Sequence, residues 1–109
     1  MQENIVPCTR KELNFTVQSL VRLSDKLKDC GNSNNSSAAS ADALCLLAQW
    51  RKDSNTLVLK EHQLPVIRFA LDEYIRDIAA EHHLLPFATR KRVESVKKTC
   101  DSLTQKWNL

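Results

Sequence analysis

Glycine and proline are scarce in this chain of 109 residues, which contains one glycine and three prolines. A protein built mainly of β-sheet needs these residues in its many tight turns, so their scarcity argues against that class. Leucine, alanine, lysine and glutamate dominate the segments with regular apolar spacing, and these are good helix formers. Composition therefore predicts an all-α protein, and the length fits a single domain with one core.

Long apolar runs and targeting signals are also lacking. No stretch of about 18 consecutive apolar residues occurs, so we expect no membrane-spanning helix and no membrane partner. The first residues, MQENIVPCTRKELNF, lack the charged start and apolar centre of a secretion signal. We therefore expect an intracellular, cytoplasmic protein whose four cysteines are free thiols.

The patterns of a catalytic, metal or nucleotide site are missing as well. The cysteines form no C-x-x-C pair, no two histidines are spaced by one helical turn, and no glycine-rich loop could hold a phosphate. His82 and His83 are adjacent, so on a helix their side chains point about 100° apart and cannot chelate together. We expect no enzyme activity, no catalytic residue, no metal or other cofactor, and no small-molecule substrate.

Apolar residues recur at helical spacing in four segments. The helices are expected at about 10–30, 40–53, 61–83 and 89–107. Thr9 and Glu12 have the spacing of a capping box at the start of the first helix, and Gly31 marks its end. The last two helices carry matching narrow apolar stripes on either side of Pro86, which is typical of an antiparallel hairpin. The prediction is a four-helix up-and-down bundle.

Two connecting segments are predicted differently. NSNNSSAAS, residues 32–40, has little apolar surface and many residues that bond their own backbone, so it is expected to be a flexible loop between helices. SNTLVLKEHQLP, residues 54–65, fits either an extended connector or an early start of the third helix. Its apolar pattern does not decide between the two.

The second predicted helix is apolar around most of its circumference. On a helical wheel, Leu44, Leu47 and Ala48 share one face. Leu46 and Trp50 project from nearly the opposite face. Such a helix is either central in its own fold or covered by another molecule, so a partner protein or a second copy of the chain is a natural candidate.

Phe15 is an apolar exception on the polar face of the first predicted helix. It either covers Ile5 and Val6 in the N-terminal arm or serves as an exposed anchor. With Leu46 and Trp50 it forms the predicted protein interface, because aromatic side chains are enriched among binding hot spots. The predicted function is a non-enzymatic protein-binding or regulatory module, with a homodimer as one form.

Positive charge is concentrated in the last predicted helix. Residues 88–109 contain six lysines and arginines against two acids, a net charge of +4, whereas residues 64–87 contain two arginines against four acids. One interpretation is a solvated helix face, balanced by ion pairs such as Glu94 with Lys98 and by the acidic neighbouring helix. The alternative is nucleic-acid binding. Cations in the first turn of a helix oppose the helix dipole and cost stability, so their presence there is explained if they contact phosphates. The residues of that predicted site are Arg90, Lys91, Arg92, Lys97 and Lys98.

Overall fold

The computed structural model describes residues 3–49, 55–81 and 88–109. Its elements are β1 (Glu3–Pro7), α1 (Arg10–Asp29), α2 (Ser33–Gln49), β2 (Thr56–Lys60), α3 (Gln63–Glu81) and α4 (Ala88–Lys106). The described part is mostly helical, as predicted, with four helices and a two-stranded sheet that the sequence did not predict. None of the described helices combines the length and the apolar character that a membrane span requires.

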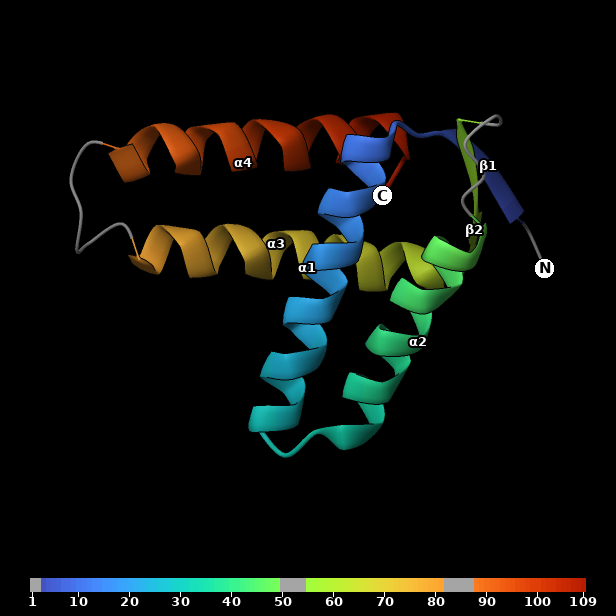
Figure 1. Ribbon diagram of the computed structural model, residues 1–109, viewed down its shortest axis with the longest axis horizontal. Helices are drawn as coiled ribbons and strands as arrows, with labels where there is room; N and C mark the ends of the chain where they lie inside the picture. The colour runs from blue at the N-terminus through green and yellow to red at the C-terminus, as the bar shows by residue number, and fades with distance from the viewer. Residues whose placement is uncertain (1–2, 50–54, 82–87) are drawn as a thin grey trace.

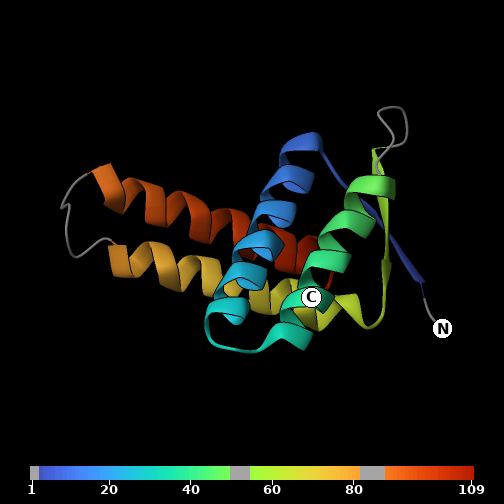
Figure 2. The same cartoon turned by 60° about the horizontal axis from the view of Figure 1, so that its bottom comes forward.

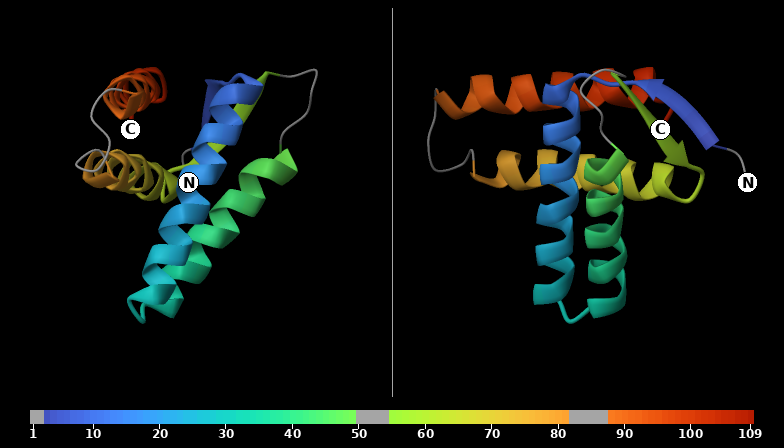
Figure 3. Two further views of the ribbon diagram at one scale, coloured as in Figure 1. Left: turned by 60° about the vertical axis from the view of Figure 1, so that its left-hand side comes forward. Right: turned by 45° about the vertical axis from the view of Figure 1, so that its right-hand side comes forward.

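The helices form two antiparallel hairpins that cross each other steeply. α3 and α4 lie side by side along the long axis of the molecule, and α1 runs across α3 with α2 beside it (Figures 1 and 3). Figure 2 shows the same crossing from another direction. The predicted up-and-down arrangement, in which all four helices share one axis, is therefore not confirmed. The link between α2 and α3 contains β2, so it does not force the two hairpins into line.

The bounds of α1 agree with the sequence prediction. The Thr9 hydroxyl accepts a hydrogen bond from the Glu12 N–H (3.1 Å), and the Glu12 carboxylate accepts one from the Thr9 N–H (2.9 Å). These two bonds complete the capping box. At the other end Gly31 has a φ of +81°, and the N–H groups of Gly31 and Asn32 donate to carbonyls of the last helical turn. This is a Schellman motif, which ends the helix at a residue that tolerates positive φ.

α2 begins at Ser33, so the predicted flexible loop at 32–40 is wrong. The polar side chains that suggested a loop are used where α2 packs against α1. Ser24 and Ser36 are buried, each hydroxyl donates to the other residue's carbonyl (2.8 and 2.7 Å), and the two hydroxyl oxygens are 3.0 Å apart. The buried stripe of α2 consists of Ser36, Ala39, Asp42, Ala43 and Leu46. The predicted end of this helix, at about 53, lies outside the described residues.

The sheet lies at the end of the α3/α4 hairpin where α3 begins and α4 ends (Figure 1). β1 pairs antiparallel with β2, with Ile5 opposite Val58, so the segment before α3 is an extended connector. Side chains bond the N–H groups of β2 that point away from β1. Gln49 accepts from the Val58 N–H (3.0 Å), and Gln63 accepts from the Lys60 N–H (3.0 Å). These bonds satisfy the open edge of β2 and attach it to α2 and α3.

The end of α4 is bonded to the beginning of the chain. The indole of Trp107 is buried, and its Nε1 donates to the carbonyl of Pro7 (2.8 Å). Lys106 Nζ lies 2.8 Å from Glu12 Oε1 on α1. Burial alone would raise the pKa of Glu12, but hydrogen bonds from Lys106 and Thr9 outweigh it and hold the pKa below its usual value. These contacts fix the position of α1 relative to α4.

The apolar stripes predicted for the second hairpin are confirmed. In α3 the buried stripe contains Ile67, Leu71, Tyr74 and Ile78. In α4 it contains Val96, Cys100, Leu103 and Trp107. Both stripes join one core with the buried residues of the first hairpin and the sheet.

Candidate functional site

The residues predicted as a protein interface are not brought together on the surface. Leu46 is 0% exposed and belongs to the core. Phe15 is half-buried, and its ring packs against Tyr74 of α3 with the ring centroids 5.2 Å apart. This corrects the expectation that Leu46 projects outward, and it gives Phe15 a packing partner that neither sequence interpretation included. Three further residues of the sequence predictions lie outside the described part of the chain, namely Trp50, His82 and His83.

The opposite side of α2 is the exposed one. We define the outer face of α2 by four exposed apolar residues in its C-terminal half, Ala41, Leu44, Leu47 and Ala48. Leu44 is 64% exposed and Leu47 is 46% exposed. The single charged residue of α2, Asp42, is buried and accepts a hydrogen bond from Gln63 Nε2 (3.2 Å). The outer face of α2 is therefore apolar and carries no charge.

The sequence contained a signal for this orientation. A helix that begins at 40 omits Ser36 and Ala39, so its apolar residues alone do not show which face is buried. When the helix is extended back to Ser33, the residues Ser36, Ala39, Ala43 and Leu46 follow one another at steps of three and four. That series marks the side on which Leu46 lies as the buried one.

Two grooves border the outer face of α2, each lined by residues of both α1 and α2. Leu47 lines one groove together with Arg10 and Leu13 of α1. Leu44 lines the other, of ≈ 540 Å³, with Lys28 of α1 among its further lining residues. The exposed leucines thus lie beside depressions that could receive side chains of another molecule.

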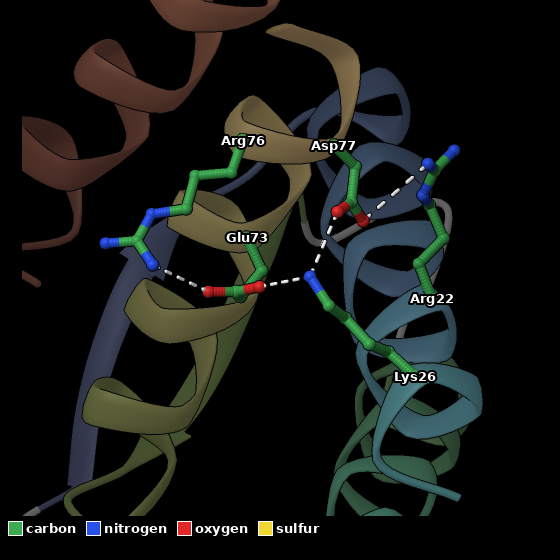
Figure 4. A network of polar contacts seen from close by, with 5 residues as sticks. All are labelled: Arg22, Lys26, Glu73, Arg76 and Asp77. Atoms are coloured by element: carbon green, nitrogen blue, oxygen red, sulfur yellow. Dashed lines mark hydrogen bonds and ion pairs between the residues drawn. The ribbon is translucent and has the colours of Figure 1, made fainter. Parts of the chain in front are cut away.

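Two acidic residues of α3, Glu73 and Asp77, pair with α1. Lys26 donates to Glu73 and to Asp77 (3.0 Å), Arg22 Nη2 lies 3.8 Å from Asp77 Oδ2, and Arg76 Nη1 lies 3.2 Å from Glu73 Oε1 (Figure 4). Hydrogen bonds to Glu73 and Asp77 raise the pKa of Lys26 above its usual value. The cluster therefore links the two hairpins at their crossing and occupies these carboxylates of α3.

Apart from Lys106, which pairs with Glu12, the cations of α4 with described side chains lack comparable partners. Lys91, Arg92, Lys97 and Lys98 are all exposed. Within the described residues, none of them forms a salt bridge. The expected pairing of Glu94 with Lys98 is likewise absent from that part of the chain. Of the four acids of α3 that were expected to balance the charge of α4, Glu73 and Asp77 are instead bound by α1.

The α4 cations do not form one compact cluster. Lys91 and Lys98 are seven residues apart and share a face of the helix. Arg92 lies about 100° around the helix from Lys91, and Lys97 lies about 100° from Lys98. Arg90 belongs to α4, but its side chain lies outside the described part. The predicted nucleic-acid residues are thus partly gathered, with Lys91 and Lys98 as the pair on one face.

The thiols of the core are poorly suited to nucleophilic chemistry. Burial raises the pKa of Cys8 to about 11 and the pKa of Cys100 to about 12, so both are protonated at neutral pH. Cys30 is exposed, Cys45 is half-buried, and all four cysteines are free. Among the residues that the structure describes, no three His, Cys, Asp or Glu side chains are grouped to hold a metal ion.

Comparisons with protein-family models, with curated proteins and with solved structures found no match for this chain. A functional assignment therefore depends on the chemistry of the described surfaces. The two most distinctive surfaces are the uncharged outer face of α2 and the four cations of α4, Lys91, Arg92, Lys97 and Lys98, that form no salt bridge with the described residues.

Proposed function

We propose that the protein is a non-enzymatic protein-binding module that associates through the outer face of α2, with a second copy of the chain as the partner. The observation that carries this proposal is the exposure of Leu44 and Leu47 on a helix whose single charged residue is buried. A surface helix normally carries charged residues opposite its buried face, as α1 and α4 do here. The exposed leucines of α2 are better explained by a contact than by solvation.

A second copy fits this face because a two-fold symmetric contact brings identical patches together. Any charge near the symmetry axis would then meet a like charge, and the outer face of α2 has none. Exposed alanines at Ala41 and Ala48 leave room for a second helix to approach closely. Lack of charge and small side chains therefore both support self-association.

The size of the face indicates that the dimer is weak. α2 has 17 residues, so it is about 26 Å long. The area that one face of a helix of this length can bury is smaller than the roughly 800 Å² that each partner buries in a standard interface. We expect a dissociation constant on the order of tens of micromolar.

Sedimentation velocity at rising protein concentration, from about 10 to 500 µM, tests the proposal over the range of that constant. The wild-type chain should shift from monomer to dimer, and a Leu44→Ser/Leu47→Ser variant should remain monomeric with an unchanged circular dichroism spectrum. Phe69→Ser is the matched control, because Phe69 is a large apolar residue of α3 that is 51% exposed. It should dimerise like the wild type.

Two results contradict the proposal. One is a wild-type chain that stays monomeric over the whole concentration range. The other is a Phe69→Ser variant that loses self-association as fully as the double leucine variant, because the effect would then not be specific to the outer face of α2.

A second candidate function is nucleic-acid binding through α4. The observation that favours it is that four exposed cations of α4, Lys91, Arg92, Lys97 and Lys98, have no salt-bridge partner within the described residues, while α1 occupies Glu73 and Asp77 of α3. Lysines and arginines that contact phosphates release counterions, so such binding weakens steeply as salt concentration rises.

Fluorescence anisotropy of labelled duplex DNA and single-stranded RNA at about 50 and 200 mM salt tests this second function. Lys91→Gln/Lys98→Gln should weaken binding and reduce the salt slope by about two, since each lost phosphate contact lowers the slope by about one. The matched control is Lys11→Gln/Lys28→Gln, which removes the same charge from exposed positions of α1. Absence of binding at the lower salt concentration contradicts the second function.

A further inference from the structure

A groove of ≈ 330 Å³ lies where α1, α3 and α4 meet. Its lining consists of Val17, Gln18, Val21, Arg22, Tyr74 and Arg92. Val17 and Tyr74 are largely buried, and Val21 is 45% exposed, so the groove contains an apolar surface that remains open to solvent. It has room for an aliphatic side chain of another molecule.

Arg22 is held in place beside this groove. Its guanidinium lies over the ring of Tyr74, 4.8 Å from the ring centroid. It also faces Asp77 at 3.8 Å, but Asp77 takes a shorter bond, 3.0 Å, from Lys26. Because a guanidinium has five N–H donors, Arg22 retains donors for a further acceptor. The Tyr74 contact orients the guanidinium in advance of any binding.

Arg92 provides the second positive charge of the lining. It is exposed and forms no ion pair with the described residues. No acidic residue lines the groove, and the neighbouring Lys91 is also exposed and unpaired within the same part of the chain. The groove therefore combines an apolar floor with two arginines, of which Arg22 shares Asp77 with Lys26 and Arg92 has no ion-pair partner within the described residues.

We infer that this groove is a docking site for an acidic segment of a partner protein, in which aliphatic side chains alternate with carboxylates. The aliphatic side chain covers Val21 and the small exposed parts of Val17 and Tyr74. The carboxylates bind Arg22 and Arg92, because the planar guanidinium matches a carboxylate with two parallel hydrogen bonds. This site is separate from the outer face of α2 and does not depend on self-association.

Charge complementarity alone would also suit a nucleic acid, but the lining favours a protein. Single-stranded nucleic acid is bound by aromatic rings on which bases stack. The ring of Tyr74 is largely buried and has a guanidinium over it, and the other apolar lining residues are valines. Valines match the aliphatic side chains of a protein segment better than they match phosphates or bases.

Three labelled synthetic peptides of about 16 residues, a length that can span a groove between helices, test the ligand chemistry. The first contains leucine and glutamate, with the leucines one helical turn apart. The second replaces each glutamate with lysine, and the third replaces each leucine with serine. Fluorescence anisotropy should show binding of the first peptide and at least about tenfold weaker binding of the other two, since each lacks one of the two interactions.

Variants of the groove test its location. Arg22→Gln/Arg92→Gln should weaken the first peptide about tenfold, and Val21→Ser should weaken it about threefold, because partly exposed contacts each contribute modestly. If Arg22→Gln lowers stability, the single variant Arg92→Gln replaces the double variant in the test, because Arg92 forms no ion pair with the described residues and its loss should not affect folding. Arg10→Gln/Lys28→Gln removes the same charge from exposed positions of α1 and should leave the affinity unchanged.

Three results overturn the inference. The first is equal binding of the leucine and serine peptides, which means that charge alone is recognised. The second is unchanged affinity in the Arg22→Gln/Arg92→Gln variant. The third is single-stranded RNA that binds more tightly than the peptide, displaces it and loses affinity in the same variant, which would make the groove part of a nucleic-acid surface. The Leu44→Ser/Leu47→Ser variant should bind the peptide normally, so failure of the dimer proposal leaves this test intact.

Discussion

α2 and α4 are helices of similar length whose inner sides are both apolar, but their outer surfaces differ in chemistry. α2 has one charged residue, Asp42, which is buried. α4 carries six lysines and arginines and two acids. Those whose side chains are described are all exposed, and among them Lys106 alone forms a salt bridge with another described residue. The difference teaches that an uncharged, apolar helix face can meet an identical face, whereas a face that carries like charges opposes such a contact. The two helices therefore suit different partners.

The largest expected effect is on the free energy of unfolding, and it compares the buried face of α2 with its outer face. Leu46→Ala should lower the free energy of unfolding by about 2 to 5 kcal/mol, because it leaves a cavity in the core. Leu44→Ala should lower it by less than about 1 kcal/mol, because the side chain is 64% exposed. Urea denaturation of the dilute monomer measures both changes. Similar losses for the two variants would contradict the assignment of Leu46 to the buried face and Leu44 to the outer face of α2.

A second prediction concerns the inner side of α4. The pKa of Cys100 is raised from 9.0 to about 12, so between these values the folded chain retains a proton that the unfolded chain releases. Stability from this thiol is fully present below pH 9 and is lost as the pH rises towards 12. The slope is at most about 1.4 kcal/mol per pH unit.

Denaturation series from neutral pH to pH 11 check this slope. Cys100→Ala should be less stable than the wild type at neutral pH but should lose less stability as the pH rises. Val96→Ala is the matched control, because it removes volume from the same stripe without removing a titratable group. Equal alkaline slopes in all three proteins would contradict the raised pKa of Cys100.

The smallest expected effect compares a paired lysine with an unpaired one. Lys26→Met should lower the free energy of unfolding by about 0.5 to 1 kcal/mol, because Lys26 bonds two carboxylates where the hairpins cross. The loss should shrink in about 1 M salt, which screens exposed charges. Lys98→Met should change stability by less than about 0.5 kcal/mol, since Lys98 has no such bond in the described chain. Thermal unfolding at low and high salt measures the difference, and an equal loss in both variants would contradict the role of the cluster.

The sequence was sufficient where a helix is specified by its own residues. The start of α1 was predicted because Thr9 and Glu12 bond each other within one turn, and its end because Gly31 accepts a positive φ. The first turn of α2 was missed because its stabilising contact is not local. Ser36 is buried only when Ser24, twelve residues earlier, supplies the matching hydrogen bonds. From the composition of residues 32–40 alone, a segment rich in serine and asparagine is predicted to be a loop.

The candidate surfaces were predictable only where they depend on a single helix. The exposure of Lys91, Arg92, Lys97 and Lys98 follows from helical spacing, and the structure bears it out. The orientation of α2 and the contact between Phe15 and Tyr74 were not predicted, because both depend on the crossing of two hairpins. Helical periodicity describes one helix at a time and contains no information on that crossing.

The bond between Trp107 and Pro7 has a consequence for the order of events during synthesis. β1 is translated before the other described elements, yet its strand partner is β2, and the carbonyl of Pro7 is bonded by a residue 100 positions later. Contacts of such long sequence separation form late, because a long loop must close first. The α1/α2 hairpin can assemble early from neighbouring residues, whereas β1 must wait for β2, and the bond from Trp107 to Pro7 can form only after α4 has been translated.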